Sequence, residues 1–385
     1  MSTSKKFIHF NFHNLATMQV EASAPTAPLL RDIFFPFITK EAAAQPDIVV
    51  TGTIKEQKNA SYGETEYEYT DTSLLIHDTG VQVLCKDGRF EVNGTRELLV
   101  SVLPLVDRVL VQKGAAMVHA ATIEYRGHGI NLPAWGGTGK TSTIAKLLKR
   151  PGYAFMGDDW AFLSEGGELM AFAKPMFIKP HHKPIYPHLF AAKKKPLVPV
   201  RFSRKLGKLT TMVHPVITQY PRLARATRKF SPEHMMVRPE AAFPEAQFSN
   251  GGPLGLTMFV ERFAGDSVIL SETTKEWMVS RIIGNFHAEV SKHSQELVVA
   301  LAASGLVPIE RYFEDKAAVV RAGLGDKPTY LLRVPQAFSP DKASDAIVYE
   351  LERVMDQIGL LSGTEAVAEI PPVDLRPELE AIGAS

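Results

Sequence analysis

The sequence predicts an α/β protein with a mixed sheet in its larger part, preceded by a β-rich N-terminal α+β domain. Three observations lead to this prediction. Residues 134–141 read A-W-G-G-T-G-K-T, between an apolar stretch and a helical pattern. A second apolar run, at residues 153–157, ends in Asp158-Asp159. Before residue 114, short apolar runs alternate with polar turn signals, which is typical of strands.

Composition sets the broad class. The chain has 385 residues, 45% of them hydrophobic and 22% charged, and a formal net charge of +1. These values suit one or two globular domains with a sizeable core. The single cysteine, Cys85, excludes an internal disulfide and points to a reducing compartment. No apolar run reaches membrane-spanning length and the first residues lack a signal-peptide pattern, so we expect a cytoplasmic protein without membrane contact.

Residues 1–113 are predicted to form the N-terminal domain. Asp87-Gly88 and Asn93-Gly94 are turn signals, and a helix is expected from a cap at Thr95 to about Gln112, with a kink at Pro104. No catalytic set of side chains is visible here, so this domain is expected to shape or cover a site. Its strands are predicted at residues 8–12, 48–54, 67–75, 81–85 and 89–92, with an exposed loop at 55–63.

The glycine-rich loop at residues 134–141 matches a phosphate-binding loop in all but one position, since Ala134 stands where a first Gly is usual. Glycines let successive N–H groups turn inward, and the following helix start adds positive potential, so the loop suits a polyphosphate. Lys140 would reach the β/γ-phosphates, and Thr141 would offer its hydroxyl to Mg²⁺. The expected nucleotide-binding residues are Trp135, Gly136, Gly137, Thr138, Gly139, Lys140, Thr141 and Ser142.

Asp158-Asp159 follows the next predicted strand. Adjacent carboxylates repel unless a cation or a shared proton offsets them, so a metal beside one and a substrate hydroxyl beside the other would explain the pair. The alternative is a surface turn with two solvated acids. Upstream, His119 sits in an apolar run at residues 115–123, where a lone histidine is usually a core residue.

This region resembles the HPr kinase/phosphorylase family and its related P-loop kinases, whose core is similar to that of phosphoenolpyruvate carboxykinases. The resemblance covers about 50 residues. It implies Asp158 as the base for the acceptor hydroxyl, Asp159 with Thr141 at the metal, and His119 beside the γ-phosphate or the aspartate, although sequence does not decide which aspartate plays which part. The matching features are His119, the Gly127 and Gly129 hairpin, the loop, a helix and Asp158-Asp159.

The resemblance has limits. The Gly-Arg-Asn-type signature found late in true HPr kinases is not found in this sequence, and the chain is longer at its C-terminal end. A kinase core over residues 114–362 is therefore expected, whereas the protein HPr as substrate is not.

Residues 174–240 form a basic, proline-rich segment of this region. Between Lys174 and Phe230 there are nine Lys and five Arg and no acid. The segment could be a solvated surface, or it could steer an acidic or phosphorylated acceptor to the site. Nucleic acid ranks last, because few aromatic residues are interleaved with the charges.

The C-terminal part is predicted to return to ordered elements. A strand at 254–260 ends in Glu261-Arg262, and by resemblance Arg262 could stabilise transferred-phosphate charge; its alternative is a salt bridge with Glu261 or another acid. A helix starting at Ser339-Pro340 should run to about residue 358, where Gly359 ends it. Other predictions are strands at 268–270, 307–313 and 330–334, a helix at 275–303 broken near Gly284, and a flexible tail at 363–385.

These features predict an ATP- and Mg²⁺-dependent kinase that transfers the γ-phosphoryl group to a hydroxyl. The acceptor could be a seryl hydroxyl of a peptide or protein, or a small molecule; GTP is not excluded as donor, and a homo-oligomer is plausible by resemblance. The alternative is a nucleotide-binding regulator or scaffold without phosphotransfer. A carboxykinase is less favoured, because its extra metal-binding Lys and His are not identified.

Overall fold

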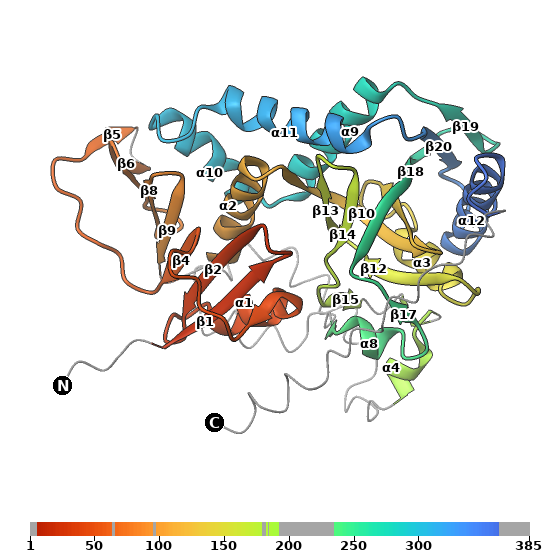
Figure 1. The fold of residues 1–385 in the computed structure, drawn as a ribbon, viewed down its shortest axis with the longest axis horizontal. Coiled ribbons are helices and arrows are strands. Elements are labelled where there is room, and N and C mark those ends of the chain that lie inside the picture. The colour runs from red at the N-terminus through yellow and green to blue at the C-terminus, as the bar shows by residue number, and fades with distance from the viewer. Residues whose placement is uncertain are drawn as a thin grey trace, which may run out of the picture. The chain divides into compact units, whose positions relative to one another are not determined.

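Two mixed sheets organise the described part of the chain. The computed structural model describes residues 6–63, 66–94, 98–178, 182–183, 185–191 and 235–361. Contacts divide the chain into two units, Met1–Lys174 with Gln247–Ser385, and Pro175–Ala246. The first unit contains both large sheets together with the helices that pack on them, which confirms the general α/β class (Figure 1). The predicted tail, most of the basic segment and the Thr95 cap lie outside the described residues.

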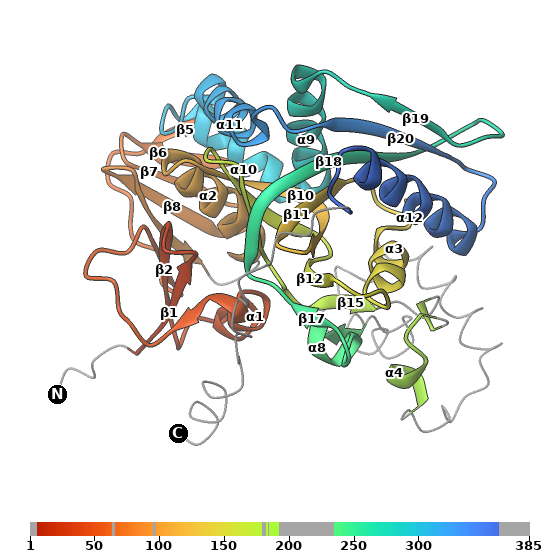
Figure 2. The same cartoon turned by 45° about the vertical axis from the view of Figure 1, so that its right-hand side comes forward.

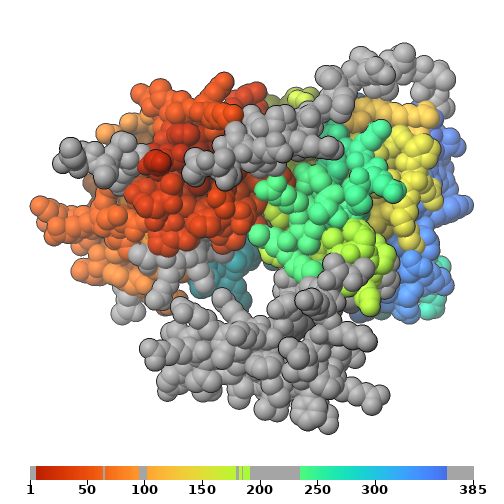
Figure 3. Space-filling model, turned by 90° about the horizontal axis from the view of Figure 1, so that it is seen from below, coloured from red at the N-terminus to blue at the C-terminus, as the bar shows by residue number. Residues whose placement is uncertain are grey.

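The first sheet is built from residues 7–94 and has the order β3-β1-β2-β4-β9-β8-β7-β6-β5. Its β2–β4 and β4–β9 pairs are parallel and the others antiparallel. Figure 3 shows the atoms of its first strands and of α1, coloured red, as one continuous surface. The strands are β1 (Phe7–Phe12), β2 (Ala16–Glu21), β3 (Ile38–Thr39), β4 (Ile48–Thr51), β5 (Ser61–Gly63), β6 (Tyr67–Thr70), β7 (Ser73–Ile76), β8 (Val81–Lys86) and β9 (Arg89–Gly94).

Turn predictions in this sheet had mixed outcomes. The Asp87-Gly88 turn is confirmed: both residues have positive φ, 52° and 73°, between the antiparallel strands β8 and β9. The Asn93-Gly94 turn is wrong, because β9 continues through both residues and the buried Asn93 side chain accepts a hydrogen bond from Thr51. The single strand predicted at 67–75 is a hairpin of β6 and β7, and part of the loop predicted at 55–63 forms β5.

The second sheet carries the site. Its order is β17-β12-β10-β13-β14-β18-β20-β19, and β11 pairs with both β10 and β18. The β11–β18 and β18–β20 pairs are parallel, whereas β10 runs antiparallel to β11, β12 and β13. The strands are β10 (Ala115–Tyr125), β11 (His128–Pro133), β12 (Tyr153–Gly157), β13 (Trp160–Ser164), β14 (Glu168–Ala171), β17 (Gln247–Phe248), β18 (Gly251–Phe263), β19 (Ile269–Glu272) and β20 (Thr329–Pro335).

The helices of the first unit gather in two groups. Helices α9 and α11 pack on each other and on β10, and α12 packs along α3 and β20 (Figure 2). Ser339 caps α12 by accepting the N–H of Lys342, as predicted, and Gly359 follows the helix end with φ 78°. The helices are α1 (Ala27–Ile33), α2 (Leu98–Gln112), α3 (Lys140–Leu147), α9 (Lys275–Glu289), α10 (Lys292–Ala303), α11 (Ile309–Leu324) and α12 (Pro340–Gln357), with a 3-10 turn at Phe35–Phe37.

Two helix predictions are corrected. The expected strand at 307–313 is wrong, because residues from Ile309 form α11, in which Tyr312 and Lys316 are buried at helical spacing. A short apolar run does not distinguish a strand from a buried helix. The break in the long helix lies at Val290 and Ser291 and not at Gly284, since the Ser291 side chain caps α10 by accepting the N–H of Ser294.

One hydrophobic core joins both sheets of the first unit. It contains residues of β1, β2 and α2 together with residues of β10, β13, α9 and α10. Aromatic rings connect the two sheets: Phe34 stacks on Phe172 with centroids 5.7 Å apart, and Phe172 stacks on Phe162 at the same distance. The strands of the site therefore rest on a continuous apolar support.

The second unit is small in its described part. Strands β15 (Met176–Ile178) and β16 (Met235–Val237) form an antiparallel pair, beside the short helices α4 (Pro187–Ala191) and α8 (Pro239–Ala242). Tyr186 is buried with its ring 5.5 Å from that of Phe243. In the described ranges, none of the helices is long and apolar enough to cross a membrane.

Candidate functional site

The glycine-rich loop joins the end of β11 to α3, which begins at Lys140. Ala134 is fully buried and forms a parallel bridge with Val260 of β18, so this position completes the strand and needs no glycine. Gly137 and Gly139 have φ of 78° and 108°, which side chains rarely adopt. The predicted strand–loop–helix is therefore confirmed, with glycine at positions where the backbone requires it.

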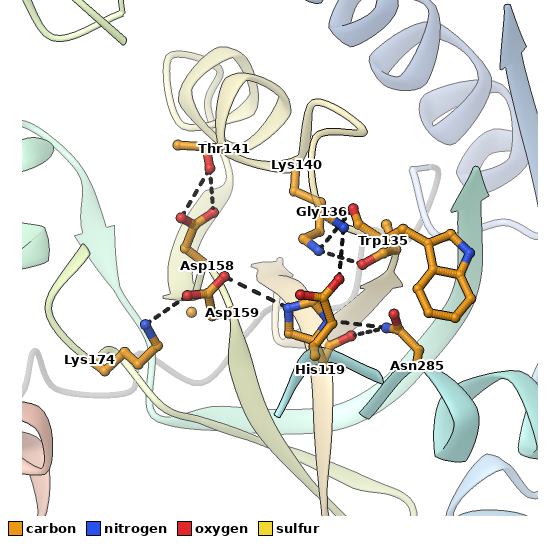
Figure 4. A network of polar contacts seen from close by, with 12 residues as sticks. His119, Trp135, Gly136, Lys140, Thr141, Asp158, Asp159, Lys174 and Asn285 are labelled. Atoms are coloured by element: carbon orange, nitrogen blue, oxygen red, sulfur yellow. Dashed lines mark hydrogen bonds and ion pairs between the residues drawn. The ribbon is translucent and has the colours of Figure 1, made fainter. Parts of the chain in front are cut away.

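Lys140 is folded onto its own loop. Its Nζ donates to the carbonyl of Ala134 at 2.5 Å and lies 3.4 Å from the carbonyl oxygen of Trp135 (Figure 4). Burial lowers the pKa of Lys140, and three nearby carboxylates oppose this shift, those of Asp159, Asp158 and Glu289. The positive charge of Lys140 is thus surrounded by three carboxylates.

The other predicted loop residues serve different local contacts. The Trp135 ring points away from Lys140 (Figure 4). The Arg281 guanidinium lies over this ring, 5.7 Å from its centroid. The Thr138 hydroxyl donates to the Trp135 carbonyl at 3.0 Å. Ser142 lies in the first turn of α3. The N–H of Gly136 donates to the carboxylate of Glu289, a residue that the sequence analysis did not select.

Asp158 follows β12 and faces the start of α3. The Thr141 hydroxyl lies 3.0 Å from both of its carboxylate oxygens. Burial, and next the charge of Asp159, raise the pKa of Asp158 to about 6. This carboxylate therefore changes charge close to neutral pH, which is a property of groups that exchange protons in catalysis.

Asp159 has a different environment. Its Oδ2 pairs with Lys174 Nζ at 2.7 Å, and its Oδ1 lies 3.9 Å from His119 Nε2 (Figure 4). Burial alone would raise the pKa of Asp159, but the charge of Lys174 and its hydrogen bond to the carboxylate, with the nearby His119 ring, outweigh it and hold the pKa well below its usual range. The two neighbouring aspartates therefore differ, because the pKa of Asp158 is raised and that of Asp159 is lowered.

His119 lies in β10 between this pair and α9. Its ring is buried and meets Trp160 edge-on, with centroids 5.3 Å apart. The fully buried Asn285 donates through Nδ2 to the His119 carbonyl oxygen at 2.8 Å, and the same Nδ2 lies 3.2 Å from His119 Nδ1. Because an amide nitrogen carries hydrogens only, Nδ1 accepts, and the ring proton belongs on Nε2, which faces Asp159.

Helix α9 is a wall of the site that the sequence analysis missed. Arg281, Asn285 and Glu289 follow each other at intervals of four residues, so they share one helix face. They contact Trp135, His119 and Gly136, respectively. The signal available in the sequence was this spacing of polar residues within an apolar helical pattern. Lys174 was also missed, because it opened a long basic run and had no distinguishing neighbour.

Arg262 lies at the end of β18, as predicted. Its guanidinium donates to the carbonyl oxygens of Gln336, at 3.1 Å, and Phe338, in the turn before α12. The alternative of an ion pair with Glu261 is wrong, since Glu261 pairs with Arg281 and with Arg333 instead. Among the described residues, these hydrogen bonds attach Arg262 to the α12 turn and not to Asp158.

Three side chains of the site offer oxygen donors to a divalent cation. Thr141, Asp158 and Asp159 present oxygen atoms, which Mg²⁺ prefers, and Mg²⁺ commonly uses one or two carboxylates together with substrate phosphates and water. No group of three or more His, Cys, Asp or Glu that could hold a metal occurs in the described ranges. The residues therefore fit a cation that arrives with a nucleotide, and they do not form an all-protein metal cage.

Comparison with protein-family models gives no match for this chain, and comparison with curated proteins gives none either.

Proposed function

We propose that this protein is an ATP-dependent kinase that transfers the γ-phosphoryl group to a hydroxyl. One observation carries the proposal: the loop residue Thr141 is hydrogen-bonded to Asp158, the first of two acids after the next strand. A phosphate-binding loop and a carboxylate of raised pKa thereby share one site. This combination supports phosphoryl transfer to a hydroxyl, which depends on positioning, charge neutralisation and, in protein kinases, an aspartate that accepts the hydroxyl proton.

Each residue has a distinct part in the proposed reaction. The N–H groups of the loop and Lys140 would bind the phosphates, and Thr141 with Asp159 would hold Mg²⁺, which supplies positive charge against the transferred group. Asp158 would accept the proton of the acceptor hydroxyl, because its pKa of about 6 lets it be ionised at neutral pH and still bind a proton. The acceptor oxygen then bonds to the γ-phosphorus as the bond to ADP breaks.

The environment of Asp159 supports its separate role. Lys174 keeps this carboxylate ionised, as a metal ligand must be, and His119 presents an N–H on its other side. Arg262 as a further charge stabiliser stays a prediction, and so do the seryl or small-molecule acceptor and the basic segment as its docking region.

The test is transfer of label from γ-³²P-ATP with Mg²⁺ to an extract of the source cells, with the unmutated protein and Asp158→Asn. We expect labelling of a discrete acceptor that the variant loses by at least about a hundredfold. Asp326→Asn is the matched control, since Asp326 is exposed and pairs with Lys275 at the surface, at 3.6 Å. Equal labelling by the wild type and Asp158→Asn would remove Asp158 as the base.

A second candidate is a nucleotide-binding regulator without phosphotransfer. The contact between Gly136 and Glu289 favours it, because an acid already placed on the loop suits a protein that responds to nucleotide occupancy. Saturable ATP binding that needs Lys140, without label transfer to any acceptor, would select this function.

A further inference from the structure

Glu289 of α9 contacts the backbone of the glycine-rich loop. It is the last residue of α9, and its Oε1 accepts the Gly136 N–H at 2.8 Å. Its charge also acts on Lys140. The glycine-rich loop of this structure therefore already has an anion on one of its backbone donors, supplied by the chain itself.

Helix chemistry does not explain an acid at this place. The C-terminal end of a helix carries partial negative charge, so a carboxylate in the last turn is unfavourable there. Glu289 is exposed and its first backbone neighbours are Ala288 and Val290, which offer it no cation. The groups that favour its charge are the Gly136 N–H and Lys140, both belonging to the loop.

The same donor cannot serve two anions. A polyphosphate wrapped by the loop would need inward-pointing N–H groups such as that of Gly136, and its negative charge would repel the Glu289 carboxylate. We propose that Glu289 is an internal anion that competes with nucleotide phosphates for the loop and thereby sets its affinity. This inference rests on the proposed function only in that the loop binds phosphates.

Release of this anion requires little rearrangement. Phe286 and Val290, which precede and follow Glu289 along the chain, are buried and anchor the end of α9 in the core. Glu289 itself is exposed, and its side chain can rotate into solvent while the helix stays in place. Nucleotide binding then costs the Gly136–Glu289 contact and does not require α9 to unfold.

Affinity measurements test the proposal directly. Kd is measured by calorimetry for ATP and for tripolyphosphate, which probes the loop without a base, using the wild type, Glu289→Gln and Glu289→Ala. We expect both variants to bind both ligands about threefold to tenfold more tightly, with the gain larger at low salt. Glu296→Gln removes the same charge from an exposed position on α10 and controls for net charge.

A spectroscopic measurement checks the contact without any ligand. In protein labelled with ¹⁵N-glycine, Glu289→Ala should shift the amide resonance of Gly136, while the resonance of Gly305, which follows the C-terminal end of α10, should stay in place. Tripolyphosphate should move the wild-type Gly136 resonance as it displaces the carboxylate. An unchanged Gly136 resonance in Glu289→Ala would overturn the proposal.

The outcomes separate this inference from the proposed function. If wild type and Glu289→Gln bind equally, and Lys140→Ala abolishes binding, the competition is disproved while the nucleotide site stands. If the wild type binds weakly and Glu289→Gln gains affinity, the competition is supported. If no variant binds ATP or tripolyphosphate, the proposed function fails and this inference fails with it.

Discussion

The hydroxyl of Thr141 is bonded to the carboxylate of Asp158, at 3.0 Å from each of its oxygens. This contact ties the start of α3 to the end of β12. The glycine-rich loop and the Asp158-Asp159 pair are therefore joined directly by a side-chain hydrogen bond.

Removing the Thr141 hydroxyl should impair transfer. Thr141→Val keeps the shape but takes away the hydroxyl oxygen proposed to bind Mg²⁺ and the hydrogen bond to Asp158, so we expect kcat to fall by about 10- to 100-fold. Thr141→Ser keeps the hydroxyl and should retain most activity. Steady-state kinetics of the two variants test this prediction. An equal fall in kcat for both would contradict a role for the hydroxyl.

The pH profile of transfer should report the ionisation of Asp158. Only the carboxylate form accepts a proton, and its pKa lies at about 6, so the rate should rise with pH up to about 6 and level off above it. The measurement is kcat/KM between pH 5 and 8 with metal in excess. A profile that is flat across this range would show that another group accepts the proton.

The same pKa predicts a gain in stability when Asp158 is replaced. Since the folded-state pKa is raised above the ordinary 3.8, protonation stabilises the fold below about pH 4, and this contribution is lost as pH rises through about 6. At pH 7 without metal, Asp158→Asn should raise the free energy of unfolding by about 1 kcal/mol, discounted for partial exposure. Urea unfolding should show the gain at pH 7 and little gain at pH 4.

Lys174 should be needed to keep Asp159 ionised. Lys174→Gln removes the 2.7 Å ion pair and should lower kcat by about tenfold or more, whereas Lys174→Arg should keep much of the activity. Lys275→Gln, at an exposed surface pair, serves as control. Full activity of Lys174→Gln would show that the pair is structural only.

Asn285 should fix the tautomer of His119. Because Nδ2 of Asn285 donates toward Nδ1 of His119, the neutral ring should carry its proton on Nε2. Long-range ¹H–¹⁵N NMR of ¹⁵N-histidine protein measures this tautomer directly. Asn285→Leu should give a mixture of tautomers and slower transfer, and an Nδ1–H ring in the wild type would contradict the assignment.

Much of the fold was predictable from local patterns. The hairpin at Asp87-Gly88, the cap at Ser339 and the strand before Asp158 depend on residues close in sequence, and all three are confirmed. Errors arose where a local signal competed with packing. Asn93-Gly94 resembles a turn, but Asn93 is paired inside the sheet with Thr51, which lies 42 residues away.

The sequence by itself determined the glycine-rich loop, its strand and helix, and the acids that follow, because glycine conformations and apolar periodicity act over a few residues. The tertiary structure decided what distinguishes the two aspartates and what surrounds the loop. Asn285 and Glu289 reach the site from α9, 166 and 153 residues from His119 and Gly136, and Lys174 reaches it from the segment between β14 and β15. Such contacts depend on how the sheet and α9 pack, and no local pattern encodes that packing.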